Sequence, residues 1–269
     1  MPPYPTADVK ASAYRRIAVI GAGAWGTALA VVASANAKVL LWAREEEVLS
    51  SIAAARENKQ FLPGIELPAA IMPVAALAEA AKADAILLVS PAQHVRGMLT
   101  SLKPHIAEAA PIVLCAKGIE TATGVLLSEI LSEVLPQAAP AILSGPSFAR
   151  DVARGLPTAV TIAAGESIAP RLAATMSRTF FRPYSSDDLT GVALGGAAKN
   201  VYAIACGMVE GAGLGESARA ATLSRGFAEL LRMGAKLGAR SETLMGLSGL
   251  GDLALTATSV SSRNFALGL

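Results

Sequence analysis

Short apolar runs alternate with alanine-rich helical stretches over the first two thirds of the chain. The runs are continuously apolar rather than alternating, which is typical of strands buried on both faces of a parallel sheet. Predicted strands cover residues 17–20, 39–42, 85–89, 112–116, 141–143 and 159–163. Predicted helices cover residues 26–34, 45–57, 74–81, 95–104, 125–135 and 168–177. This order predicts a doubly wound α/β domain with ligands at the carboxyl edge of its strands.

The pattern changes near residues 181–188, where a proline, two serines and two aspartates predict a linker followed by a helix N-terminus. Beyond this point the pattern predicts no strands. Predicted helices there cover residues 189–209, 216–238 and 241–247. We therefore predict a loose arm at residues 1–14, an α/β domain at residues 15–187 and an all-helical domain at residues 188–269.

Composition limits the class of protein. The 269 residues correspond to one or two domains. With 53% hydrophobic and 16% charged residues, the chain can bury enough apolar surface to exclude disorder. The net charge of +2 leaves no polybasic footprint, so nucleic acid is not an expected partner.

Cysteine and histidine are both scarce. The two cysteines, Cys115 and Cys206, lie in apolar runs and are expected to be packed thiols in a reducing compartment. The two histidines, His94 and His105, are expected at the surface. We therefore predict no metal site, no disulfide framework and no histidine-based triad.

Residues 17–37 contain no charge and follow Lys10, Arg15 and Arg16, so the segment resembles a secretory signal or a membrane anchor. Its details favour a different interpretation. The first apolar run is rich in β-branched residues, and glycines then interrupt it where a signal or a span would continue. We therefore expect a strand, a turn and a helix here, and no integral membrane span.

Gly21, Gly23 and Gly26 form a G-x-G-x-x-G motif between the first predicted strand and the first predicted helix. In that context the first glycine permits a tight turn, the second lets a pyrophosphate approach the backbone, and the third allows close helix–strand packing. The motif predicts that residues 15–187 form a Rossmann-like dinucleotide-binding domain. The alternative is a glycine-rich turn without a ligand.

Arg44 lies just after the second predicted strand, where an NAD-preferring site would carry a carboxylate. Arginine pairs with the 2′-phosphate of NADP, whereas a carboxylate would repel it. We therefore predict a preference for NADP(H), with NAD(H) as the alternative cofactor. The alternative for Arg44 itself is a solvated surface residue before three glutamates.

Three charged residues occur in apolar surroundings. Lys199 is the only charge between Asp188 and Glu210, and Asp252 is the only charge between Glu242 and Arg263. Because burying a lone charge is costly, Lys199 and Asp252 are expected to pair, and a desolvated lysine can exchange protons near neutral pH. Lys117 ends the fourth predicted strand, at the edge where ligands bind. The alternatives are a structural ion pair and a lysine extending from a helix face to solvent.

Two short polar segments suit an oxyanion. Ser262, Arg263 and Asn264 supply a hydroxyl, a guanidinium and an amide in succession. Residues 144–147 form a strand-end turn with free backbone N–H groups and a hydroxyl. Taken singly, each segment also fits ordinary surface.

Together these segments resemble the bacterial NAD(P)-dependent glycerol-3-phosphate dehydrogenase family. The resemblance is carried, in the family's order, by residues 21–30, 116–120, 144–149, 194–201, 249–253 and 262–264. The run from Leu194 to Val201 is the most specific. The match extends over residues 15–269.

The resemblance implies roles for individual residues. Lys199 corresponds to the proton acceptor for the C2 hydroxyl of glycerol 3-phosphate, with Asp252 and Lys117 beside it in the catalytic group. Substrate-binding positions are Lys117, Gly145, Ser147, Lys199, Asn200, Asp252, Ser262, Arg263 and Asn264. Cofactor-binding positions are Gly21, Gly23, Ala24, Trp25, Gly26, Arg44, Lys117, Ala149 and Arg263.

The implied reaction is reversible reduction of dihydroxyacetone phosphate by NAD(P)H, which supplies glycerophospholipid synthesis. Family members are cytoplasmic and form homodimers, and they continue past the position of Leu269, so the helical domain is expected to be shorter than in the family. Two other functions remain open from the residues: a dehydrogenase of the same plan acting on a hydroxy acid, and a nucleotide-sensing module without catalysis.

Overall fold

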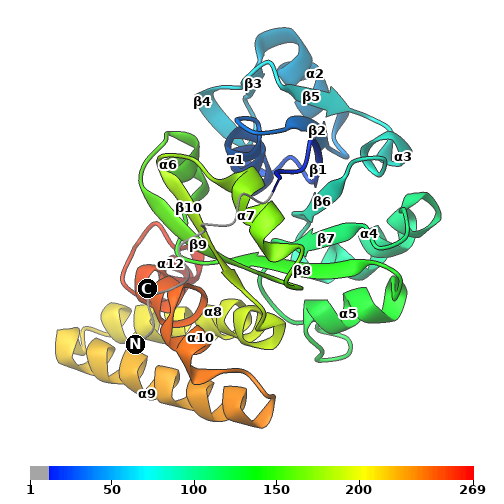
Figure 1. Cartoon of the computed structure of the whole chain (residues 1–269). Helices are drawn as coiled ribbons and strands as arrows, with labels where there is room; N and C mark the ends of the chain where they lie inside the picture. Colours follow the sequence, from blue (N-terminus) through cyan, green and yellow to red (C-terminus); the bar gives the residue numbers. More distant parts are fainter. Residues whose placement is uncertain (1–11) are drawn as a thin grey trace.

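A computed structural model describes residues 12–269, and its centre is an eight-stranded sheet with the order β10-β9-β8-β7-β6-β1-β2-β5 (Figure 1). The strands are β1 (Arg16–Ile20), β2 (Lys38–Trp42), β5 (Ile71–Val74), β6 (Ala85–Leu88), β7 (Pro111–Leu114), β8 (Ala139–Ser144), β9 (Thr158–Ala164) and β10 (Phe181–Ser186). Each predicted strand corresponds to one of these, and the doubly wound prediction is confirmed.

Strand order determines where a ligand can bind. The chain passes from β1 outward through β2 to β5 on one side, and through β6 and β7 to β8 on the other. All these neighbours are parallel. The order therefore reverses between β1 and β6, and doubly wound proteins bind ligands at the carboxyl ends of the strands beside such a switch.

Helices cover both faces of the sheet, because successive strand residues point to opposite sides. The face of Ile17 and Val19 packs against α1 (Ala24–Ala33), and the face of Ala18 and Ile20 packs against α4 (Val95–Leu102). The other helices of this part are α2 (Glu46–Ala55), α3 (Leu77–Ala80), α5 (Leu127–Val134), α6 (Ala149–Ala153) and α7 (Ala169–Met176), with 3₁₀ turns η1 (Ala92–His94) and η2 (Lys103–His105).

Three features of this part differ from the sequence-based predictions. The segment predicted as a linker forms the edge strand β10, where Pro183 is tolerated because an edge strand has one unpaired side. β9 runs antiparallel to β8, a direction that apolar runs do not encode. The pattern also missed β5, α6 and the hairpin of β3 (Glu57–Asn58) and β4 (Leu62–Glu66).

The structure describes all of residues 188–269, and helices are the only regular elements there. These helices lie together at one end of the sheet (Figure 1). They are α8 (Leu189–Gly211), α9 (Gly215–Lys236), α10 (Ser241–Met245), a π-helical turn η3 (Leu247–Gly251), α11 (Asp252–Ala257) and α12 (Arg263–Gly268). Asp188 caps α8 by accepting a hydrogen bond from the N–H of Gly191 at 2.7 Å, as the predicted helix N-terminus requires. The sequence pattern missed α11 and α12.

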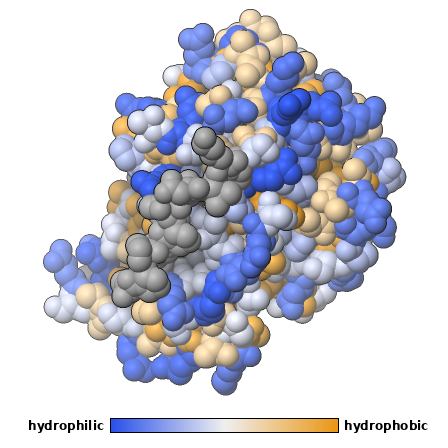
Figure 2. Space-filling view, viewed as in Figure 1, coloured by the Kyte–Doolittle hydropathy of each residue, from blue (hydrophilic) through white to orange (hydrophobic). Residues whose placement is uncertain are grey.

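One helix among the described residues, α8, is long and apolar enough to span a membrane by length and composition. It packs against α9, α11, α12 and β8 and carries the buried Lys199, which accounts for its composition as a core helix. The uncharged segment near the N-terminus forms β1 and α1, which confirms the strand–turn–helix prediction. On the coloured part of the face in Figure 2, hydrophobic residues occur in small groups among hydrophilic ones.

Candidate active site

The glycine turn joins β1 to α1 beside the switch in strand order. Gly21 has a φ of +113°, and a Cβ at this position would lie 3.1 Å from the carbonyl oxygen of Val89. A Cβ on Gly26 would overlap the carbonyl oxygen of Gly21, whereas a Cβ on Gly23 would meet nothing within 4 Å. The turn therefore needs glycine at its first and third positions for packing, and it leaves the space at Gly23 where a pyrophosphate would approach.

Asn58 of β3 holds this turn from a distant part of the chain. Its fully buried side-chain amide donates to the carbonyl oxygen of Ala22 at 2.7 Å and to Thr27 Oγ1 at 2.8 Å. Asn58 Oδ1 accepts a hydrogen bond from the N–H of Phe61. Sequence reasoning missed this residue, because no local motif connects it to the turn 36 residues earlier.

Arg44 follows β2 at the same edge and is 80% exposed, with a 3.3 Å ion pair to Glu45. It lines an open cavity of about 350 Å³ together with Gln93 and His94 of η1. The cavity lies beside the loops that follow β2 and β6, where the adenosine half of a dinucleotide binds in this fold class.

Lys117, Lys199 and Asp252 come together from three separate elements. Lys199 Nζ of α8 donates to Asp252 Oδ1 at 2.5 Å, and Lys117 Nζ, after β7, pairs with Asp252 Oδ2. Lys117 Nζ also donates to the carbonyl oxygen of Gly145 at 3.0 Å. The ion pair predicted from the isolated charges is present, and a single carboxylate serves two ammonium groups.

Burial and charge change the acidity of Lys199. Its side chain is 10% exposed, and burial, followed by the nearby Lys117 ammonium, lowers its pKa from 10.5 to about 8 against the opposing effect of Asp252. Thr256 Oγ1 accepts a second hydrogen bond from Lys199 Nζ at 2.9 Å. Sequence reasoning missed Thr256, although its spacing of four residues from Asp252 places both on one helix face.

Two glycines let α8 approach the other elements of this cluster. A Cβ on Gly195 would lie 2.6 Å from the carbonyl oxygen of Ser248 in η3. A Cβ on Gly196 would lie 2.9 Å from Ser144 Oγ and 3.3 Å from Cγ of Lys117. Because these glycines precede Lys199 by one turn, close packing brings its side chain to Asp252 while Lys117 passes alongside.

The polar segment at the start of α12 lies against α8. The buried Ser262 caps α12, because its Oγ accepts a hydrogen bond from the N–H of Phe265 at 3.3 Å. Asn264 donates to Asn200 Oδ1 of α8 at 2.7 Å, and the neighbouring Arg263 is exposed. These residues form a candidate anion-binding group, separate from the Lys199 contacts.

The structure also gives the positions of the other candidate residues. Ser147 Oγ donates to the Gly145 carbonyl oxygen at 3.2 Å. Ala24 and Trp25 of α1 and Ala149, the first residue of α6, pack against one core. Cys115 and Cys206 are buried free thiols, and His94 and His105 are exposed.

The glycine turn alone would be consistent with any dinucleotide-binding protein. A lysine that can exchange a proton near neutral pH, together with a carboxylate and a candidate anion-binding group, is consistent with an NAD(P)-dependent dehydrogenase. The following comparisons identify the family within that class.

Two family models match this chain. The NAD-dependent glycerol-3-phosphate dehydrogenase N-terminus matches residues 16–169, and the corresponding C-terminus matches residues 188–269. The chain therefore belongs to the glycerol-3-phosphate dehydrogenase family.

Similar proteins carry the same family name. The chain is 62% identical over 259 residues to glycerol-3-phosphate dehydrogenase [NAD(P)+] of Parvibaculum lavamentivorans, covering 96% of this chain and 78% of the relative. The relative from Rhodospirillum rubrum is 56% identical over 94% of this chain and 73% of its own length. The crystal structure of glycerol-3-phosphate dehydrogenase from Coxiella burnetii superposes with a TM-score of 0.89 at 38% identity, over 95% of this chain and 80% of that one.

Proposed function

We propose that this chain catalyses the reversible reduction of dihydroxyacetone phosphate to sn-glycerol 3-phosphate with NAD(P)H. The observation that carries the proposal is the cluster of the buried Lys199 and Asp252 with the part-buried Lys117 at the carboxyl edge of the sheet, on the same edge as the glycine turn. The product is a precursor of glycerophospholipids, so the enzyme would supply that synthesis.

A role for each part of the site follows from the substrate's chemistry. The phosphate of dihydroxyacetone phosphate needs a cation and hydrogen-bond donors, which Arg263, Ser262 and Asn264 provide. Asn200 orients Asn264 by accepting its hydrogen bond. Gly145 and Ser147 at the turn after β8, and the ammonium of Lys117, would contact the polar end of the substrate.

Proton transfer is the step that this chain's own residues perform. The bound nicotinamide would supply a hydride to C2 of the ketone. Lys199 would donate its proton to the carbonyl oxygen as negative charge develops there, and in the oxidative direction it would accept the proton of the hydroxyl group. Asp252 and Thr256 hold the Lys199 ammonium in place, and the Lys117 ammonium stabilises charge on the same oxygen.

The cofactor would bind along the glycine turn. Gly21, Gly23, Ala24, Trp25 and Gly26 line the approach to the first turn of α1, whose N–H groups can meet the pyrophosphate. Further contacts would come from Lys117, Ala149 and Arg263.

We infer a preference for NADPH over NADH, because the exposed guanidinium of Arg44 lies on the open cavity after β2. Arg44→Ala is expected to lower kcat/KM for NADPH by roughly 10-fold or more, consistent with loss of charge-assisted hydrogen bonds to phosphate. The value for NADH should change little. Steady-state kinetics with both cofactors measure the ratio, with Arg16→Ala, at the opposite edge, as control. An unchanged ratio would show that Arg44 does not select the cofactor.

The two directions of the reaction should respond oppositely to pH. Reduction needs the protonated form of Lys199, so its kcat/KM is expected to fall as pH rises through the pKa of about 8. Oxidation needs the neutral amine, so its kcat/KM is expected to rise over the same range. Rate measurements in both directions across neutral and alkaline pH test this. Parallel profiles would point to a different proton-transfer group.

The decisive experiment follows NADPH oxidation with dihydroxyacetone phosphate and with unphosphorylated dihydroxyacetone. We expect turnover only with the phosphorylated ketone. Equal rates with both would favour a dehydrogenase of another substrate class. NADPH binding without turnover of either would favour a nucleotide-sensing module.

We also propose that the protein acts in the cytoplasm as a homodimer, as the family resemblance implies. Sedimentation equilibrium of the purified protein tests the oligomeric state, and a mass of one chain at all concentrations would contradict it.

A further inference from the structure

The loop that carries Lys117 runs between β7 and α5 and turns sharply after the lysine. Gly118 has a φ of +144°, a conformation that residues with a Cβ rarely adopt, and a Cβ there would lie 3.2 Å from Cβ of Ala92 in η1. Ile119, the next residue, is 48% exposed. The loop beyond Lys117 therefore lacks a buried apolar anchor at this point, and polar contacts must determine its position.

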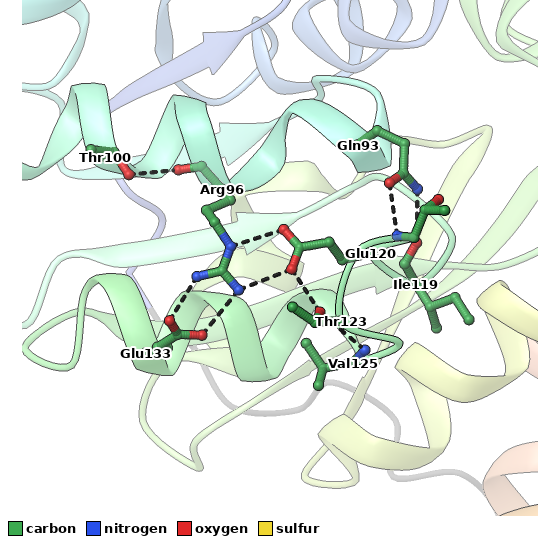
Figure 3. Close-up of polar contacts among 9 residues, drawn as sticks. Gln93, Arg96, Thr100, Ile119, Glu120, Thr123, Val125 and Glu133 are labelled. Atoms are coloured by element: carbon green, nitrogen blue, oxygen red, sulfur yellow. Dashed lines mark hydrogen bonds and ion pairs between the residues drawn. The ribbon is translucent and has the colours of Figure 1, made fainter.

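Glu120 provides such a polar anchor. Its carboxylate accepts two hydrogen bonds from the guanidinium of Arg96 on α4, at 2.9 and 3.0 Å, and a third from Thr123 Oγ1 at 2.7 Å (Figure 3). Its backbone N–H donates to Val125, and its carbonyl oxygen accepts from Gly124. Hydrogen bonding to Arg96 lowers the pKa of Glu120, so the carboxylate is ionised at neutral pH.

Gln93 of η1 secures both neighbours of Glu120. Its side-chain nitrogen donates to the carbonyl oxygen of Ile119 at 2.8 Å, and its side-chain oxygen accepts from the N–H of Thr121 at 2.9 Å (Figure 3). Gln93 and Arg96 together therefore hold three successive loop residues. The first of the three, Ile119, lies two positions after Lys117.

Arg96 also binds a second carboxylate, which comes from a helix rather than from this loop. Glu133 of α5 pairs with the same guanidinium at 2.7 and 3.0 Å, but its side chain is 63% exposed against 10% for Glu120. Both glutamates pair with the guanidinium through two hydrogen bonds, but only the less exposed Glu120 belongs to the loop, so only its pair restricts where the loop lies. The two glutamates therefore share Arg96 as a partner, but only Glu120 is part of the loop that carries Lys117.

We propose that Arg96 and Glu120 are positioning residues that fix the loop after β7 and thereby hold the Lys117 ammonium against Asp252. The proposal rests on the role of Lys117 in the reaction proposed above. When this bidentate pair is broken, the loop relaxes around Ile119 and Lys117 withdraws from Asp252. A displacement of about 1 Å in a reacting group can cost on the order of 100-fold in rate.

The test compares Glu120→Gln with the matched control Glu133→Gln. Glu120→Gln is expected to lower kcat for dihydroxyacetone phosphate reduction by roughly 10-fold or more, with little change in KM for NADPH. Glu133→Gln should keep kcat within about twofold, because Glu133 lies on α5 and its pair with Arg96 holds no residue of the Lys117 loop. Gln93→Ala provides the test if Glu120→Gln fails to fold: because Gln93 also lines the Arg44 cavity, it is measured at saturating NADPH, where kcat should fall in the same direction as in Glu120→Gln.

The pH profile supplies a readout that a purely structural role would leave unchanged. The groups facing Lys199 are Asp252 and Thr256 of α11 and Lys117 from the loop, and the Lys117 ammonium contributes to the lowered pKa of Lys199. If Lys117 withdraws, the pKa of Lys199 rises, and the fall of reductive kcat/KM shifts to higher pH. Glu120→Gln and Gln93→Ala should both show this shift, and Glu133→Gln should not.

Lys117→Ala, measured in parallel, separates the role of Lys117 in the reaction from the positioning role of Arg96 and Glu120. If Lys117→Ala retains full activity, the proposed role of Lys117 fails. If Lys117→Ala loses activity while Glu120→Gln and Gln93→Ala behave like Glu133→Gln, the positioning role is overturned.

Discussion

Lys199→Ala is expected to lower kcat for dihydroxyacetone phosphate reduction by roughly 10²–10⁴-fold, the usual contribution of a positioned general acid or base. The physical reason is that Lys199 is buried beside Asp252 and Thr256 with a pKa of about 8, and so exchanges a proton readily near neutral pH. Affinity for NADPH should be nearly unchanged, because the glycine turn lies on a different element. Single-turnover rates and cofactor titration by fluorescence measure the two quantities.

Two further variants sharpen this prediction. Lys199→Arg keeps a cation at the site but holds its proton at all accessible pH values, so it should be as inactive as Lys199→Ala if proton transfer is the role. Lys236→Ala removes an exposed lysine at the end of α9 and should retain full activity. A kcat loss of only a few fold in Lys199→Ala would reassign the proton donor, with Lys117 the next candidate.

Asp252→Asn is expected to destabilise the folded state by about 3–5 kcal/mol, because it removes the one carboxylate between two ammonium groups. The Asp252 side chain is 1% exposed, so water cannot replace the lost charge. Lys199 and Lys117 would then repel each other in a poorly solvated region. Urea unfolding at neutral pH, followed by circular dichroism, measures the change in the free energy of unfolding.

A double variant distinguishes this electrostatic cause from lost packing. Adding Lys199→Met to Asp252→Asn removes one of the two unpaired cations, so the double variant should be more stable than Asp252→Asn alone. Glu229→Gln, which breaks an exposed pair with Arg232 on α9, should change stability by less than about 1 kcal/mol. A double variant no more stable than Asp252→Asn would contradict the electrostatic explanation.

Much of the candidate site could be predicted from the sequence because its signals are local. The glycine motif lies between a strand and a helix, and Lys199 and Asp252 are isolated charges in apolar runs. A lone charge in such a run must find a partner when the run is buried, so the pairing follows from the cost of desolvation. The pairing of both lysines with one carboxylate could not be predicted in the same way, because Lys117 and Asp252 lie 135 positions apart.

The missed elements also have physical explanations. The strand β10 contains proline and serines, which resemble a linker, and it forms a strand only because β9 offers a pairing edge. The helices α11 and α12 have six residues each, too short for a helical period to stand out from its surroundings. Asn58 and Thr256 carry no charge, so their burial leaves no conspicuous signal in the sequence.

The sequence by itself determined six strands of the main sheet, the glycine turn and the residues that must be buried as charges, since backbone conformation and periodicity are set by neighbours in the chain. Only the tertiary structure decided the antiparallel return of β9, the meeting of Lys117, Lys199 and Asp252, and the hold of Arg96 on Glu120. Each of these depends on contacts between segments far apart in the sequence, and such contacts arise from the packing of the whole chain rather than from any local preference.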